Sequence, residues 1–143
     1  MKYRVIFFMV FALFIAFLSC SKNDGSRIPE AFVEYRTTVM DFDSRKDEND
    51  IVLVNGQGVA GLIICKVGQY SYVAYDRCSS VNPEKRCAVV PDNRFTATDP
   101  CSGAMFSLID GAPAKAPAER NLKRYNVRVS NNFNILVSND YGN

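Results

Sequence analysis

Short segments with the composition of β-strands follow one another at close intervals after residue 50, and they constrain the fold of this chain most. Each is rich in β-branched and aromatic residues and is bounded by Gly, Asn or charged residues, which is typical of strands joined by tight turns. Gly68-Gln69 and Asn131-Asn132 predict two hairpins. The clearest strand candidates are residues 51–54, 61–67, 70–76, 122–130 and 133–139, and further candidates are residues 31–42, 87–90, 94–98 and 104–108.

The rest of the chain adds loops to this pattern. Residues 43–50 are charged and residues 113–120 are rich in Pro and Ala, so both are expected to be loops. Outside the N-terminus no segment shows the 3.6-residue apolar period of an amphipathic helix. The length of 143 residues leaves room for one domain. The sequence therefore predicts one small all-β domain, an antiparallel sandwich or barrel.

The N-terminus has the features of an export signal. Lys2 and Arg4 precede an apolar run at residues 5–17, which is too short for a spanning helix and fits a signal peptide. The run ends at "FLSCS", residues 17–21, which resembles the lipobox of a bacterial lipoprotein. We expect a signal peptide at residues 1–19, a lipidated tether at residues 20–29 that begins at Cys20, and a β domain at residues 30–143. An ordinary cleaved signal and a signal anchor remain the alternatives.

The charge and the anchor suggest a location and a class of partner. Without Lys2 and Arg4, the 17 basic residues fall to 15 and equal the 15 acidic ones, which argues against a nucleic-acid partner. Acylation of Cys20 would hold the chain on a membrane of the bacterial cell envelope. Ser21 beside the anchor cysteine indicates the outer membrane. The expected partners are the membrane and an unidentified protein or small molecule.

Four further cysteines lie in the predicted β domain, and histidine is absent from the whole chain. An exported chain with an even number of cysteines favours disulfides, but four cysteines allow three pairings and the sequence alone does not choose among them. Without histidine there is no Ser-His pair and no imidazole to activate a cysteine. We therefore expect that the protein is not an enzyme. The four cysteines are Cys65, Cys78, Cys87 and Cys101.

Two loops collect the unusual residues of the chain. Loop one is "DRCSSVNPEKRC", residues 76–87, and loop two is "TDPCSGAMF", residues 98–106. Around and within them the motifs "AYDRC", "PCSGAMF", "IDGAP", "APA" and "NLKRYNVRV" follow in that order. With these motifs the chain resembles the Rieske 2Fe-2S family over residues 56–139. The resemblance implies a small antiparallel β fold with two cluster-type loops, in which each loop supplies one Cys and one His to the cluster.

The resemblance also gives the positions of the cluster ligands in this chain. The two cysteine ligands match Cys78 and Asp99, and the two histidine ligands match Ser80 and Ser102. Hydroxyl groups are poor ligands for a sulfur-bridged iron cluster, so the usual site is not expected to form. Cys101 retains the position of the loop-two disulfide cysteine.

Cys87 ends loop one, where the partner of Cys101 would lie, so the resemblance implies a disulfide between these two. An alternative is a cluster held by all four cysteines of the domain. Against that alternative, Cys65 falls inside a predicted strand, whereas the other three lie in or beside the loops.

These features predict a membrane-anchored lipoprotein whose Rieske-like domain has lost its cluster and acts as a structural or binding module without a cofactor. One alternative, implied by the resemblance, is an electron-transfer protein with a 2Fe-2S cluster. A further alternative is a surface lipoprotein that binds a ligand, for which Tyr70, Tyr72 and Tyr75 would provide a stacking surface.

Overall fold

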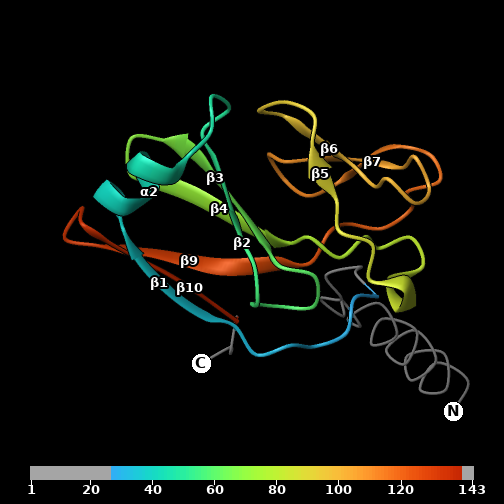
Figure 1. The fold of residues 1–143 in the computed structure, drawn as a ribbon, viewed down its shortest axis with the longest axis horizontal. Helices are drawn as coiled ribbons and strands as arrows, with labels where there is room; N and C mark the ends of the chain where they lie inside the picture. The colour runs from blue at the N-terminus through green and yellow to red at the C-terminus, as the bar shows by residue number, and fades with distance from the viewer. Residues whose placement is uncertain (1–26, 140–143) are drawn as a thin grey trace, which may run out of the picture.

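The computed structural model describes residues 27–139, and Cys20 with the predicted signal and most of the tether lies outside this range. Two antiparallel sheets make up the described part (Figure 1). The larger has six strands in the order β1-β10-β9-β4-β3-β2 and the smaller has four in the order β5-β6-β7-β8. The predicted all-β class is confirmed. Within residues 27–139 no helix has the length and apolarity needed to cross a membrane.

The strands of the larger sheet follow the sequence pattern closely. Strands β3 and β4 pair across the predicted hairpin, and β9 and β10 pair across the Asn131-Asn132 turn, where both asparagines have positive φ. Strand β1 is shorter than the predicted strand at residues 31–42. The bounds are β1 Glu34–Thr38, β2 Ile51–Val54, β3 Leu62–Gly68, β4 Ser71–Asp76, β9 Arg124–Ser130 and β10 Asn134–Ser138.

A short helix replaces the end of the predicted first strand. The Thr38 hydroxyl accepts a hydrogen bond from the Asp41 backbone N–H at 3.0 Å, which caps helix α2, Val39–Arg45. Phe42 is buried on its inner face, and its ring packs edge-on against Tyr72 with 4.9 Å between centroids. The expected strand therefore ends at Thr38, and the first residues of the expected loop at 43–50 are helical.

The smaller sheet is built from shorter strands than the sequence predicted. The segment at residues 87–90 is mostly irregular, because only one isolated bridge joins Ala88 to Cys78 before β5 begins. Residues 113–115, which were expected to form part of a loop, pair with β7 as an exposed edge strand. The bounds are β5 Val90–Pro91, β6 Thr96–Thr98, β7 Met105–Ser107 and β8 Pro113–Lys115.

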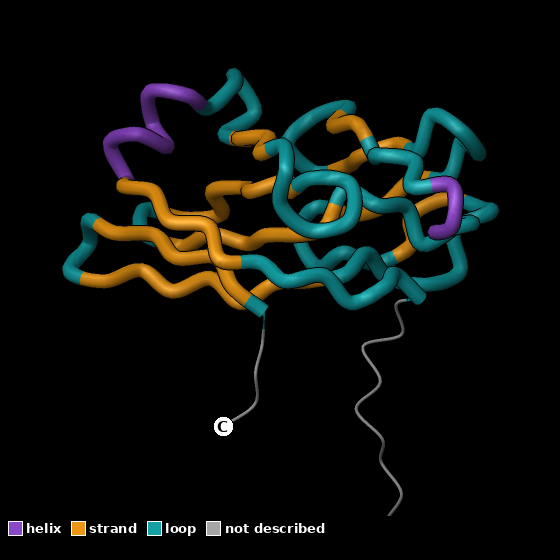
Figure 2. Tube along the Cα trace, turned by 60° about the horizontal axis from the view of Figure 1, so that its bottom comes forward, coloured by secondary structure: helices purple, strands orange, loops and turns teal. Residues whose placement is uncertain are grey.

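Strands β3 and β4 bury both of their faces, because alternate residues point into two separate cores. The first core lies inside the curled larger sheet and includes Leu62 and Ile64 of β3 together with Val137 of β10. The second core lies between the two sheets and includes Ile63 of β3 and Phe106 of β7. These two cores place the loops that follow β4 and β6 at one end of the domain. Figure 2 shows this end, marked by the short 3-10 helix η1 (Pro83–Lys85), opposite α2.

Candidate functional site

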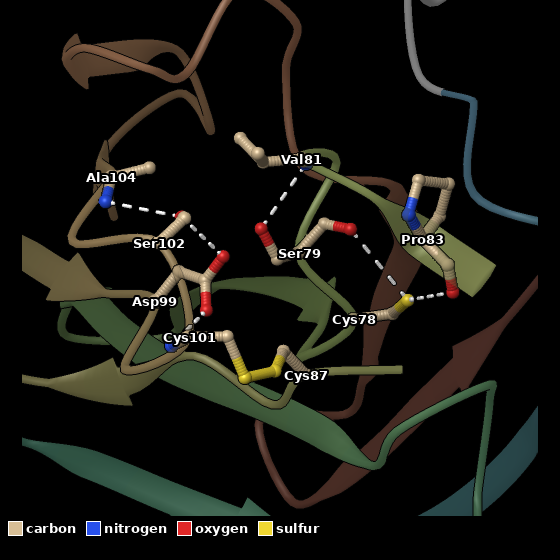
Figure 3. The surroundings of a disulfide bond; sticks show 9 residues. All are labelled: Cys78, Ser79, Val81, Pro83, Cys87, Asp99, Cys101, Ser102 and Ala104. Atoms are coloured by element: carbon tan, nitrogen blue, oxygen red, sulfur yellow. Dashed lines mark hydrogen bonds between the residues drawn. A yellow bond between two sulfur atoms is a disulfide. The ribbon is translucent and has the colours of Figure 1, made fainter. Parts of the chain in front are cut away.

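A disulfide joins the two loops that the sequence singled out. Cys87 at the end of loop one and Cys101 in loop two are bonded, with 6.3 Å between their Cα atoms, so the predicted pairing is confirmed (Figure 3). Cys65 and Cys78 are free and buried. The disulfide argues against the four-cysteine cluster, because two of its four sulfurs are bonded to each other. Cys65 in addition lies in β3 and belongs to the second core.

A buried carboxylate holds the start of loop one. Asp76, the last residue of β4, is fully buried, and its Oδ1 accepts hydrogen bonds from the backbone N–H groups of Cys78 at 2.8 Å and Ala60 at 3.1 Å. Its Oδ2 accepts from the backbone N–H of Val59 at 2.7 Å and from the Tyr125 hydroxyl at 2.8 Å. These four donors fix where loop one leaves the sheet. Sequence reasoning did not identify this role, although an acidic residue directly after the apolar run at residues 72–75 was a signal for it.

Cys78, the one cysteine that matches a cluster ligand, is a protonated thiol in a closed environment. Its side chain is fully buried and its Sγ donates to the backbone oxygens of Pro83 at 3.6 Å and Ser79 at 3.7 Å. Burial raises the pKa of the Cys78 thiol to about 11, and the negative charge of Asp76 acts in the same direction. A thiol with this pKa is not an activated nucleophile at neutral pH.

Both serines at the histidine positions are engaged in hydrogen bonds within the domain. The Ser80 hydroxyl donates to the backbone oxygen of Arg120 at 2.6 Å and ties loop one to the segment before β9. The Ser102 hydroxyl donates to Asp99 Oδ2 at 2.6 Å. Both hydroxyls are therefore used within the domain, Ser80 between distant segments and Ser102 within loop two. The Arg120 contact was not predictable from the sequence, because its acceptor is a backbone oxygen.

Asp99, at the position of the second cysteine ligand, is a fully buried carboxylate that stays ionised. Burial alone would raise its pKa. Hydrogen bonds from the hydroxyls of Ser102 and Ser79 and from the Cys101 backbone N–H outweigh the burial, so the pKa of Asp99 lies below its usual value. The Cys101 N–H lies 2.8 Å from Asp99 Oδ1. This carboxylate is thus an acceptor for groups from both loops, as Figure 3 shows for loop two.

These four residues do not fit a Rieske cluster. The cluster needs two thiolates and two imidazoles, whereas the positions hold one protonated thiol, two hydroxyls and one carboxylate. The two hydroxyls and the carboxylate also hold hydrogen bonds within the domain. Hard oxygen donors of this kind do not replace thiolates on a soft, sulfur-bridged iron pair.

The expected tyrosine surface is not formed. Tyr72 and Tyr75 are buried at 7% and 0% exposure, and only Tyr70 of the three reaches solvent. The two faces of strand β4 are covered by the two cores, and Tyr72 belongs to the first core and Tyr75 to the second. The prediction of a ligand stacked on all three tyrosine rings is therefore wrong for this fold.

No protein-family model matches the sequence, and no curated protein matches it either. Solved structures with a similar fold are Rieske proteins. The cyanobacterial plasma membrane Rieske protein PetC3 from Synechocystis is 25% identical with a TM-score of 0.54, over 71% of this chain and 94% of that chain. A ferredoxin of carbazole 1,9a-dioxygenase from Nocardioides aromaticivorans is 19% identical with a TM-score of 0.51, over 78% and 100%.

A complex of reduced oxygenase and oxidised ferredoxin in carbazole 1,9a-dioxygenase also matches, with 22% identity and a TM-score of 0.52, over 74% of this chain and 93% of that chain. The likeness extends over nearly the whole length of these domains. The chain therefore has the Rieske-like fold that the sequence predicted.

Proposed function

We propose that this protein is a bacterial lipoprotein, anchored through Cys20, whose Rieske-like domain holds no 2Fe-2S cluster and serves as a structural or binding module of the cell envelope. The observation that carries the loss of the cluster is the hydrogen bonding of Ser80 and Ser102, which are tied to Arg120 and Asp99 at 2.6 Å each. The anchor rests on the sequence at residues 17–21. The proposal of an outer-membrane location is based on Ser21, which follows the anchor residue Cys20.

The same site supports a role other than catalysis. The chain has no histidine, and burial keeps the Cys78 thiol protonated, so no imidazole base and no thiolate nucleophile is supplied there. The loops are held by a disulfide and by buried carboxylates, which gives a rigid surface of the kind that suits binding to a partner protein or a small molecule.

Metal analysis tests the loss of the cluster. The full chain is expressed in a host with cluster assembly machinery, and iron, acid-labile sulfide and visible absorption are measured on the purified protein. We expect neither iron nor sulfide in stoichiometric amount. Two irons and two sulfides per chain would establish the electron-transfer alternative, which the 25% identity to a Rieske protein favours.

The anchor needs a separate test, because it is independent of the loops. Cys20→Ser is compared with the unchanged chain by membrane fractionation and by mass spectrometry of the N-terminal peptide. We expect acylated Cys20 in the membrane fraction and release of the variant from it. A Cys20 that carries no lipid in the unchanged chain would contradict the anchor.

A ligand-binding lipoprotein is the second candidate, and a hollow of about 370 Å³ favours it. Val67, Phe95 and Ile109 line this hollow and are 46%, 57% and 60% exposed, so large apolar side chains gather there uncovered. Strand directions place it at the end of the sandwich away from loops one and two. Loss of ligand binding on Phe95→Ser would favour this function, and binding unaffected by that change would exclude this hollow.

A further inference from the structure

Three ligand-type side chains converge at the disulfide, and of these only Asp99 lies at a Rieske ligand position. The sulfurs of Cys87 and Cys101 and a carboxylate oxygen of Asp99 all lie within 4.8 Å of one another. The hydrogen bond from the Cys101 N–H to Asp99 Oδ1, at 2.8 Å, places the carboxylate beside the sulfur of the residue two positions later. Cys87 reaches this point from loop one, so the group joins both loops (Figure 3).

The carboxylate in this group carries a buried negative charge. Asp99 is fully buried, and its partners are all neutral: the hydroxyls of Ser102 and Ser79 and the backbone N–H groups of Cys101 and Ser102. Among residues 27–139 Asp99 forms no salt bridge with a lysine or arginine. A buried anion without a cationic partner attracts a cation, provided that ligands of suitable softness stand beside it.

We propose that reduction of the Cys87–Cys101 disulfide opens a site for a thiophilic divalent cation of the Zn²⁺ type, held by the two thiolates and the Asp99 carboxylate. Zinc binds thiolate at about 2.3 Å and carboxylate at about 2.0–2.2 Å, which separates the ligand atoms of a tetrahedral site by about 3.4–3.8 Å. The three ligand atoms lie within 4.8 Å of one another in the oxidised form, so breaking the sulfur–sulfur bond and small side-chain rotations would bring them to these separations. Water takes the fourth position, and the hydroxyl of Ser102 orients the carboxylate from behind.

The electrons and protons of this change come from a dithiol reductant. One thiolate of the reductant attacks a sulfur of the disulfide, the Cys87–Cys101 bond breaks, and the reductant closes to its own disulfide. The protein gains two electrons and two protons as two thiols. Binding of the cation then releases both thiol protons to water. Cys101 is exposed and Cys87 partly so, which leaves the bond within reach of the reductant.

Cobalt titration tests this site, because Co²⁺ occupies zinc sites and its spectrum reports the ligands. The full chain is titrated with Co²⁺ before and after treatment with a phosphine reductant, and Zn²⁺ is then used to displace the cobalt. We expect the reduced chain to bind one Co²⁺ with thiolate-to-metal absorption in the near ultraviolet and the visible bands of a tetrahedral ion. The oxidised chain is expected to show neither.

Matched variants identify the ligands. Cys87→Ser with Cys101→Ser is expected to abolish the thiolate absorption, and Asp99→Asn is expected to weaken Co²⁺ and Zn²⁺ binding at least about 10-fold. Glu48→Gln, which changes an exposed carboxylate far along the sequence, is expected to leave binding unchanged.

Replacing the two buried cysteines, Cys65 and Cys78, by serine separates this site from binding through other thiols. That variant is expected to keep the cobalt spectrum. A reduced chain without the spectrum, an affinity unaffected by Asp99→Asn, or a spectrum lost when Cys65 and Cys78 are replaced would overturn the proposal. So would loss of the β circular dichroism signal on reduction, because the site needs both loops in place.

Discussion

Replacing Tyr125 by Phe removes one donor from the buried Asp76 carboxylate and leaves the ring in place. The hydroxyl donates to Asp76 Oδ2 at 2.8 Å, and both residues are at most 2% exposed. A hydrogen bond to a charged group contributes about 1.5–3 kcal/mol net, and a buried lone pair left without a donor adds to the loss. With three backbone donors remaining on the carboxylate, we expect the free energy of unfolding to fall by about 2 kcal/mol.

Urea unfolding followed by far-ultraviolet circular dichroism measures this loss. The chain has no tryptophan, so fluorescence would depend on the tyrosines that are being changed. For a slope of about 1–2 kcal/mol per molar urea, a loss of 2 kcal/mol lowers the midpoint by about 1–2 M. An unchanged slope would show that the variant is less stable and not differently folded.

Tyr75→Phe is the control, since it removes a buried hydroxyl that has no hydrogen-bond partner within residues 27–139, whereas the Tyr125 hydroxyl has one. Burial raises the pKa of the Tyr75 hydroxyl to about 12. Its removal relieves a desolvated polar group, so stability is expected to stay the same or rise by about 1 kcal/mol. Equal effects of Tyr125→Phe and Tyr75→Phe would refute the role given to Asp76.

Three further outcomes follow from the site. Serine at both disulfide cysteines should cost on the order of 3 kcal/mol, because the bridge closes a loop across 14 positions, and the variant's urea midpoint should no longer respond to reductant. Gly111→Ala should lower the free energy of unfolding by roughly 2–4 kcal/mol, since φ is +80° and the new Cβ would lie 2.8 Å from the Tyr75 ring. Gly103→Ala is the control, because φ is +73° but the space is open, and it should lower the free energy of unfolding by only about 1–2 kcal/mol. Equal losses for the two variants would contradict the packing at Gly111. Asp99 has a lowered pKa in the folded state, so its stabilisation is complete above the unfolded value of about 3.9 and is lost as pH falls through the folded value. The urea midpoint of Asp99→Asn should therefore approach that of the unchanged chain only in acid, and a gap that is constant with pH would disprove this.

The strands were predictable where local pattern and turn chemistry agree. The hairpin after β9 needs two residues with positive φ, and Asn131 and Asn132 supply them. Helix α2 escaped prediction because Val39 and Met40 continue a strand-like pattern, and only the cap between Thr38 and Asp41 marks the change. The edge strand β8 escaped for a similar reason, because its Pro-rich sequence is equally typical of an extended loop.

The sequence predicted where the site residues lie along the chain, but not which groups their side chains contact. The resemblance to the Rieske family implied the pairing of Cys87 with Cys101, which the structure confirms, and it assigned ligand positions to Ser80, Asp99 and Ser102. The partners of these side chains come from distant segments, such as the backbone oxygen 40 positions away that accepts from Ser80. A backbone acceptor leaves no trace in the side-chain pattern, so only the folded structure shows that the hydroxyl is already used.

The two cores on either side of β3 and β4 leave the four ligand positions outside both of them. The apolar packing of the sheets and the hydrogen bonding of the loops are therefore separate supports of this domain. Ser80, Asp99 and Ser102 contribute to the second, because each holds a hydrogen bond within the domain. Redesign of these loops for a new metal or a new partner can keep the apolar interior, but it has to replace those hydrogen bonds.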